Sequence, residues 1–500
     1  MNENGKIFYA KAGNENGLTE KLYLNPKMAN RHGFICGATG TGKSVTLKVL
    51  AESFSELGVP TFFSDVKGDM AGIGKAGEDN ENMQERIARF DIKDQFKYHP
   101  FPVTIYDVYG EKGIPLRTTV SEMGPQLMSQ ILELNDTQAD LLTVSFKIAD
   151  DKQLLLYDTK DLKALLTYIS DNAAQLKDDY GHIAPTSMAT IIRAIVALEA
   201  EGADRFFGEP AIDINDFFRT DASGYGIVNV LASEALINKP KLYSAFMLYL
   251  LSELFDVLPE VGDLDRPKIV FFFDEAHLLF NNASKALMEK IEQVVKLIRS
   301  KGVGIFFVTQ SPGDIPNSVM AQLGNKIEHA LHAYTPAEQK VVKAAADSFR
   351  ENSEFDTVEL LQNLGTGEAV VSMLDEKGTP GIARHAYILP PESFMGAITD
   401  SERDNLVKVS TLFNKYGTAV DNPSAYETLR GGKSSSASKK EKPGDFDKMK
   451  KSVASTTGST VGREVGKVIG EAVLGKRGKT LGGNIGSTIG RNILGTLIRK

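Results

Sequence analysis

The residues between positions 37 and 45 have the types and spacing of a site that binds phosphate groups. Glycines at this spacing let successive backbone N–H groups curl around a triphosphate, Lys43 can reach the β- and γ-phosphates, and the Ser44 hydroxyl can ligate Mg²⁺. We therefore predict that this segment binds ATP together with Mg²⁺, and that Lys43 also serves in catalysis. The segment reads Gly37-Ala38-Thr39-Gly40-Thr41-Gly42-Lys43-Ser44-Val45, in which the first eight residues match G-x-x-x-x-G-K-[ST].

A phosphate loop of this kind needs a strand before it and a helix after it, and the sequence offers both. Residues 34–36 are a short apolar run that predicts a buried strand. After the loop, Leu47, Leu50, Phe54 and Leu57 recur at spacings of three and four, and the pattern ends at Gly58. The surroundings of the motif are those that its chemistry requires.

Two further strand ends carry polar groups suited to hydrolysis. Residues 268–275 predict a buried strand that ends in two acids. Asp274 is expected to hold the Mg²⁺ shell, and Glu275 to polarise a water for attack on the γ-phosphate. A strand over residues 304–309 ends in Gln310, which suits a sensor beside the attacking water. The alternative for Gln310 is a residue that only caps the following turn.

Several segments together resemble the bacterial HerA-like ATPases, and most of all their YjgR type. The similarity covers about residues 20 to 395 and rests on residues 31–44, Asp65-Val66-Lys67-Gly68-Asp69, Phe207-Gly208-Glu209-Pro210, Asp274-Glu275-Ala276-His277 and Thr309-Gln310. This resemblance implies the HerA/FtsK branch of RecA-like motors. It implies an α/β fold with a RecA-like additional-strand P-loop NTPase core, and a homohexameric ring that couples ATP hydrolysis to movement of DNA or protein.

The resemblance has one departure, which limits what it implies about partners. HerA proteins carry a β-barrel ahead of the ATPase core that helps to dock a nuclease, whereas about thirty residues precede the phosphate loop here. We therefore expect no nuclease partner of the HerA type. Two functions stay open: a motor with DNA in the pore of its ring, and an ATPase that acts on protein or membrane-bound partners in secretion or assembly. A P-loop kinase fits less well, because Glu275 suits water activation.

Motors of this class take an arginine from the neighbouring subunit to stabilise charge on the transferred phosphoryl group. Arg384, within Gly381-Ile382-Ala383-Arg384-His385, is the first candidate, and Arg299, before the strand over 304–309, is the second. The alternative for each is a surface arginine paired with an acidic residue.

The separation of 231 residues between Lys43 and Asp274 exceeds what a minimal core needs, so an insertion is expected. Apolar residues recur at helical spacing within 122–149, 162–172 and 188–201, which predicts an inserted helical subdomain. The expected organisation is a short N-terminal segment (1–30), a first segment of the RecA-like core (31–120), the insert (121–222), a second segment of the core (223–395), a C-terminal helical extension (396–430), a flexible linker (431–457) and a Gly-patterned basic tail (458–500).

Charge is distributed unevenly along the chain. Of 57 Lys and Arg and 65 Asp and Glu, residues 431–500 hold 15 and 5, a net of +10, which leaves 42 and 60 before them, a net of −18. An acidic body disfavours wrapping DNA on the outside but leaves a basic pore open. For the tail, disorder, a membrane surface and self-association all stay open. The single cysteine, Cys36, and the lack of a signal or membrane segment lead us to expect a cytoplasmic protein.

Overall fold

The computed structural model describes residues 2–14, 17–281 and 283–431. Residues up to 255 and 260–430 form one compact unit. The predicted linker and basic tail lie outside the described residues, apart from Gly431. In the described ranges no single helix is long and apolar enough to cross a membrane, and one pair of helices bent by 99°, 173–180 with 185–199, meets the length and composition criteria together.

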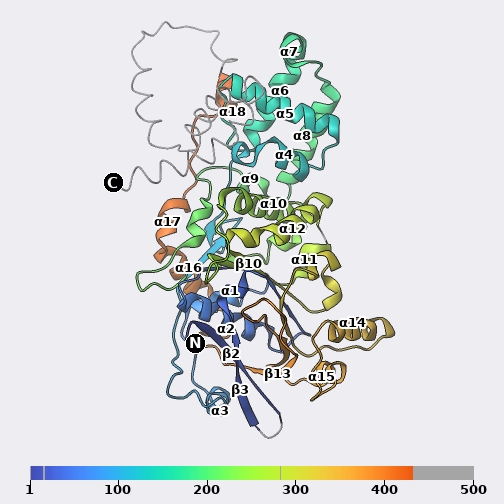
Figure 1. Cartoon of the computed structure of the whole chain (residues 1–500). Helices are drawn as coiled ribbons and strands as arrows, with labels where there is room; N and C mark the ends of the chain where they lie inside the picture. The colour runs from blue at the N-terminus through green and yellow to red at the C-terminus, as the bar shows by residue number, and fades with distance from the viewer. Residues whose placement is uncertain (1, 15–16, 282, 432–500) are drawn as a thin grey trace. The chain divides into compact units, whose positions relative to one another are not determined.

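A thirteen-stranded mixed sheet organises this unit, in the order β1-β2-β13-β12-β11-β4-β10-β9-β5-β8-β6-β7 with β3 paired to β2 (Figure 1). The strands are β1 (Asn2–Glu3), β2 (Lys6–Asn14), β3 (Gly17–Leu24), β4 (Gly33–Cys36), β5 (Thr61–Asp65), β6 (Val103–Asp107), β7 (Ile114–Pro115), β8 (Val228–Ala232), β9 (Ile269–Phe273), β10 (Val303–Thr309), β11 (Asn325–Glu328), β12 (Glu368–Ser372) and β13 (Arg384–Ile388).

The central strands β11, β4, β10, β9, β5, β8 and β6 run parallel. Strand β10 lies between β4, which leads into the phosphate loop, and β9, which ends in the acidic pair. This inserted strand defines the additional-strand arrangement, so the predicted fold class is confirmed. The carboxyl ends of β4, β10, β9 and β5 meet at one edge of the sheet, and the predicted functional residues follow those ends.

Phenylalanine side chains fill both faces of the central sheet, which explains why its strands read as continuous apolar runs. On one face Phe63, Phe272 and Phe306 stack in a row, with ring centroids 4.6 and 5.2 Å apart, and Phe54 of α2 (Lys43–Glu56) covers Phe272. On the other face Phe280 of α11 (Ala276–Asn281) packs on Phe307 at 5.2 Å. Buried on both sides, the sheet holds the strand ends at fixed positions.

Helices between β7 and β8 form a group of their own, in which α5 packs against α4, α6 and α8 (Figure 1). The helices of this insert are α4 (Val120–Ile131), α5 (Asp136–Asp151), α6 (Thr159–Asp171), α7 (Ala173–Tyr180), α8 (Pro185–Glu199) and α9 (Ala203–Phe206). The remaining helices are α1 (Pro26–Ala29), α3 (Glu81–Arg89), α10 (Pro240–Val257), α12 (Lys285–Leu297), α13 (Asn317–Met320), α14 (Pro336–Asp347), α15 (Thr357–Asn363), α16 (Asp400–Val409), α17 (Thr411–Tyr416) and α18 (Ala425–Gly431).

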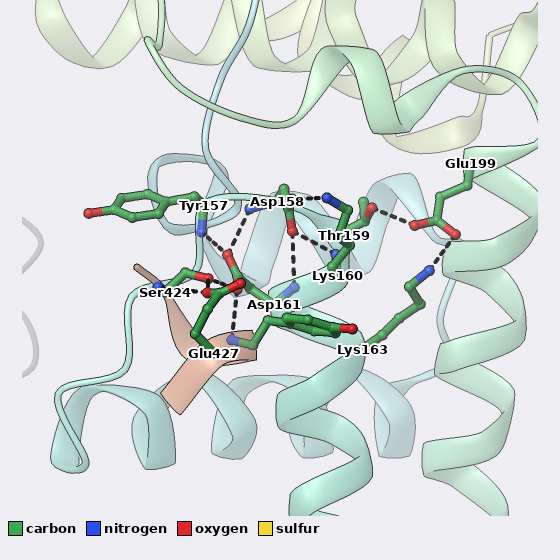
Figure 2. A network of polar contacts seen from close by, with 10 residues as sticks. Tyr157, Asp158, Thr159, Lys160, Asp161, Lys163, Glu199, Ser424 and Glu427 are labelled. Carbon is green, nitrogen blue, oxygen red and sulfur yellow. Dashed lines mark hydrogen bonds and ion pairs between the residues drawn. The ribbon is translucent and has the colours of Figure 1, made fainter. Parts of the chain in front are cut away.

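The C-terminal extension is tied to this insert through one buried carboxylate, Asp161 (Figure 2). One of its oxygens accepts the backbone N–H of Tyr157 at 2.8 Å and of Asp158 at 3.2 Å, which caps α6. The other accepts the Ser424 hydroxyl and, at 3.0 Å, the N–H of Tyr426 in α18. A carboxylate with four donors is well compensated for its burial. The extension is therefore part of the folded unit.

Two parts of the sheet differ from the sequence-based expectation. Residues 2–24, expected only as a short segment, form β1 to β3 and lengthen the sheet beyond β13. No strand was predicted between Asp65 and the insert, whereas β6 and β7 lie there. Strand β6 pairs in parallel with β8, which follows the insert. The helices of the insert therefore lie in the connection between two neighbouring strands of the sheet.

Candidate nucleotide site

The phosphate loop joins β4 to α2 and is anchored by backbone hydrogen bonds to the neighbouring strands. The N–H of Gly37 donates to Thr309 O at 3.3 Å, and the N–H of Ala38 donates to Ala330 O at 2.8 Å. Gly42 has φ 114°, a conformation that favours glycine, and a Cβ there would lie 3.2 Å from the backbone of Gly367. A side chain at position 42 would therefore disrupt the shape of the loop.

The first turn of α2 presents free backbone donors to the loop. It begins without a side-chain cap and without an acidic residue. The partial positive charge of a helix N-terminus is thus available to a negatively charged ligand. Lys43 is 5% exposed, and its ammonium donates to Ala38 O at 3.1 Å and also to Gly37 O. The lysine therefore already lies within the curl of the loop.

The acidic pair and the predicted sensor lie together at the same sheet edge. Asp274 and Glu275 follow β9, both 5% exposed, and Glu275 has a positive φ of 47°. The side-chain amide of Gln310 donates to both Glu275 carboxylate oxygens, at 3.3 and 3.1 Å. Gln310 thus contacts the expected base directly. His277 Nδ1 lies 3.3 Å from Glu275 Oε2, which places this histidine at the rim of the site.

A lysine that was assigned no role from the sequence completes this group. The Lys67 ammonium lies 2.7 Å from Glu275 Oε1 and 3.9 Å from Asp274 Oδ2. Lys67 belongs to the Asp-Val-Lys-Gly-Asp segment, which served only to establish the resemblance. Its position follows from the pairing of β5 with β9, because Ser64 pairs with Phe273 and the residues after each strand are then neighbours.

Burial and the charge of Lys67 together raise the pKa of Asp274 and lower that of Glu275. Burial raises the pKa of Asp274 to about 6 against the lowering effect of the Lys67 charge. Burial also raises the pKa of Glu275, but the hydrogen bond and charge of Lys67 outweigh it and lower that pKa below its ordinary value. For Lys43, burial and then the charge of Lys67 lower the pKa. Glu275 is held as a carboxylate, the form that a base requires.

A buried histidine, which sequence reasoning missed, fixes the helix that carries the loop. His329 follows β11, is fully buried, and its Nε2 lies 2.9 Å from the Thr46 hydroxyl. Its Nδ1 lies 2.8 Å from Glu368 O. Burial lowers the pKa of His329 to about 4, so the ring is neutral and bridges two polar groups. No local spacing in the sequence indicates this bridge, because its three residues come from distant segments.

The two candidate arginines lie away from this cluster in their own subunit. Arg384 begins β13, three strands from β4 in the sheet order, and its guanidinium lies 3.5 Å from Glu20. Arg299 lies in the turn before β10, at the opposite edge of the sheet, and its guanidinium lies 2.9 Å from Asp263. Each guanidinium is thus paired with an acidic residue outside the phosphate loop. A role in a neighbouring subunit's site stays a prediction for both.

The donor set of the site fits Mg²⁺ that arrives with a nucleotide. A serine hydroxyl at the start of α2 and a carboxylate at the end of β9 are hard oxygen donors, which this ion prefers. Within the described residues no cluster of three or more His, Cys, Asp or Glu could hold a metal ion. Mg²⁺ is ordinarily bound through one or two protein oxygens plus substrate phosphates. Ser44 and Asp274 match that pattern.

The sequence of this chain is similar to those of proteins named as helicases. The sequence model of a family described as helicase HerA-like C-terminal matches residues 11–500. The DNA double-strand break repair helicase HerA of Sulfolobus acidocaldarius is 23% identical over 372 residues, which are 70% of this chain and 63% of that protein. The HerA of Saccharolobus solfataricus is 22% identical over 435 residues, covering 81% and 74%. The chain thus spans less than two thirds of the first relative's length.

Solved structures also align with most of this chain. The bacterial conjugative coupling protein TrwB aligns with a TM-score of 0.49 and 15% identity, covering 76% of this chain and 89% of that one. VirB4 of Thermoanaerobacter pseudethanolicus aligns with a TM-score of 0.47 and 18% identity, covering 78% and 97%.

Proposed function

The chain belongs to the helicase HerA-like C-terminal family, and from this premise we propose that it is a Mg²⁺-dependent ATPase that assembles into a homohexameric ring and moves nucleic acid. The observation that carries the proposal is the grouping of the phosphate loop, Asp274, Glu275 and Gln310 at one sheet edge. Motors need such a grouping because hydrolysis depends mainly on positioning and on stabilising charge. The relatives, which are named as DNA repair helicases, supply the substrate class, DNA.

Each side chain of the group has a part in hydrolysis. Lys43 and the N–H groups of the loop bind the β- and γ-phosphates and stabilise the charge that develops on them. Glu275 orients a water toward the γ-phosphate and accepts its proton, while Gln310 holds the carboxylate in place. Ser44 and Asp274 hold Mg²⁺, which when bound neutralises part of the phosphate charge. Buried His329 keeps α2 and the loop in register with β12.

A second function has its own support in the charge distribution. Residues 1–430 carry a net charge of −18, which disfavours contact of the outer surface with DNA. An ATPase that acts on a protein or at a membrane would not need a basic surface. Under this alternative the same site hydrolyses ATP, and only the partner differs. Binding experiments can therefore distinguish the two functions, whereas the chemistry of the site cannot.

A binding titration with DNA tests the proposed substrate. We expect a gel shift with double-stranded DNA in the presence of a non-hydrolysable ATP analogue, and a weaker shift when salt rises from about 50 to about 200 mM, on the order of tenfold or more, since phosphate contacts release counterions. The Lys43→Ala protein is the matched control, because it should lose the dependence on the analogue. If neither single- nor double-stranded DNA binds at the lower salt, the protein or membrane function is favoured.

A further inference from the structure

Lys67 lies beside both the expected base, Glu275, and the expected Mg²⁺ ligand, Asp274. Its ammonium lies 2.7 Å from Glu275 Oε1, on the expected base. It also lies 3.9 Å from Asp274 Oδ2, the carboxylate assigned to the Mg²⁺ that accompanies the β- and γ-phosphates. A lysine side chain with several rotatable bonds can therefore reach the base or the γ-phosphate from the same backbone position.

The backbone that carries Lys67 is held firmly, so only its side chain is free to change partners. The buried Asp65 carboxylate accepts the N–H groups of Lys67 at 3.1 Å, Gly68 at 2.8 Å and Met70 at 3.0 Å. Gly68 has φ 77°, a conformation that favours glycine. The Lys67 side chain itself is 37% exposed. The loop thus fixes the backbone at Lys67, and the side chain reaches the acidic pair from a partly exposed position.

Both carboxylate oxygens of Glu275 have polar partners. One carboxylate oxygen contacts the Lys67 ammonium, and both accept from the Gln310 amide. An ammonium bound at 2.7 Å opposes transfer of a proton from water to the same oxygen, because the proton would arrive beside a positive charge. The base becomes free to act once Lys67 leaves. A γ-phosphate, with more negative charge than a carboxylate, is a stronger partner for an ammonium.

We propose that Lys67 exchanges partners during the ATP cycle: it pairs with Glu275 in the empty site and moves to the γ-phosphate when ATP binds. Glu275 is then released only when a triphosphate lies in the loop. Lys67 is a positioning residue that couples recognition of the γ-phosphate to the availability of the base. This inference rests on the proposed ATPase function and adds a mechanism that prevents Glu275 from acting beside a diphosphate.

A double-mutant cycle on nucleotide affinity tests the exchange. The Kd values of ADP and of a non-hydrolysable ATP analogue, each with Mg²⁺, would be measured by calorimetry for the parent, Lys67→Met, Glu275→Gln and the double variant. If Lys67 exchanges partners, Glu275→Gln should lower the Kd of the analogue by about fivefold or more when Lys67 is present, because Lys67 no longer has an ion pair to break. The same change should tighten it less in the Lys67→Met background. ADP affinity should vary by less than about twofold throughout.

The sign of the coupling between the Lys67 and Glu275 substitutions distinguishes an exchange of partners from simple repulsion between Glu275 and the γ-phosphate. If Lys67 stays on Glu275, the glutamate repels the γ-phosphate most when Lys67 is absent, so Glu275→Gln would tighten the analogue equally or more in the Lys67→Met background. That result would overturn the exchange. Lys67→Arg should restore the coupling, because it keeps the charge. Unchanged ADP affinity shows that each variant is folded with an intact loop. If the parent binds neither nucleotide, the proposed ATPase function itself fails.

Discussion

Replacing Glu275 with glutamine should slow ATP turnover by about 10² to 10⁴ while nucleotide binding is retained. The amide has nearly the shape of the carboxylate and can still contact Gln310, so the site should keep its geometry. It cannot accept a proton from water, which is the step assigned to this residue. Lys43 and Ser44, which bind the phosphates and Mg²⁺, are unchanged. Single-turnover hydrolysis and nucleotide affinity, measured on the same preparation, separate the two effects.

Glu328→Gln is the matched control for this substitution. Glu328 ends β11, the strand beside β4, and is 1% exposed. Burial raises its pKa to about 7. The substitution is therefore again Glu to Gln in a buried carboxyl group at the same sheet edge, at a residue without a part in the proposed chemistry. We expect Glu328→Gln to hydrolyse ATP at the parent rate. Parent-like turnover by Glu275→Gln would show that another group is the base.

Removal of the arginine that acts across the ring interface should lower ATP turnover by about 10³ or more. For Arg384→Ala the structure predicts little loss of stability, because the guanidinium has one exposed partner, Glu20 at 3.5 Å. Exposed ion pairs of this kind contribute about 0 to 1 kcal/mol to the free energy of unfolding. A large loss of rate with an unchanged thermal midpoint would therefore indicate a catalytic contribution. The ATPase rate at saturating ATP is the measurement.

Glu20→Ala is the control, since it breaks the same ion pair and leaves the arginine in place. Mixing experiments then test whether the arginine acts on a neighbour. Arg384→Ala subunits have an intact phosphate loop, and Lys43→Ala subunits have an intact arginine, so a mixed ring should recover activity that neither variant has. If mixing is verified and no activity returns, Arg384 does not act across the interface. Arg299→Ala, with Asp263→Ala as its control, is the next pair to examine.

The grouping of the residues of the candidate nucleotide site could be predicted from the sequence because these residues lie in short segments. A phosphate loop is contiguous, and Asp274, Glu275 and Gln310 each closely follow a strongly apolar strand. Parallel strands bring such ends to one edge of the sheet, so their proximity could be predicted without coordinates. The structure shows that contact directly, in the hydrogen bonds from Gln310 to Glu275.

What the sequence did not show depends on contacts between distant segments. The place of Lys67 follows from the pairing of β5 with β9, across more than 200 residues. The bridge from Thr46 through His329 to Glu368 joins α2, the end of β11 and the start of β12. Strand β3 contains exposed charged residues and pairs only with β2 at the outer part of the sheet, so it shows no continuous apolar run. The run at residues 7–10 of β2 is buried but was assigned no strand. Local periodicity carries little information on such pairings.

The most direct test is the rate of inorganic phosphate release from ATP by the purified protein, measured with and without double-stranded DNA and compared with Lys43→Ala. A ring-forming motor that moves DNA should release phosphate from ATP in the presence of Mg²⁺, release it faster when DNA is added, and lose both activities in Lys43→Ala. Phosphate release that is absent in the parent, or that persists unchanged in Lys43→Ala, would contradict the proposed role of this site.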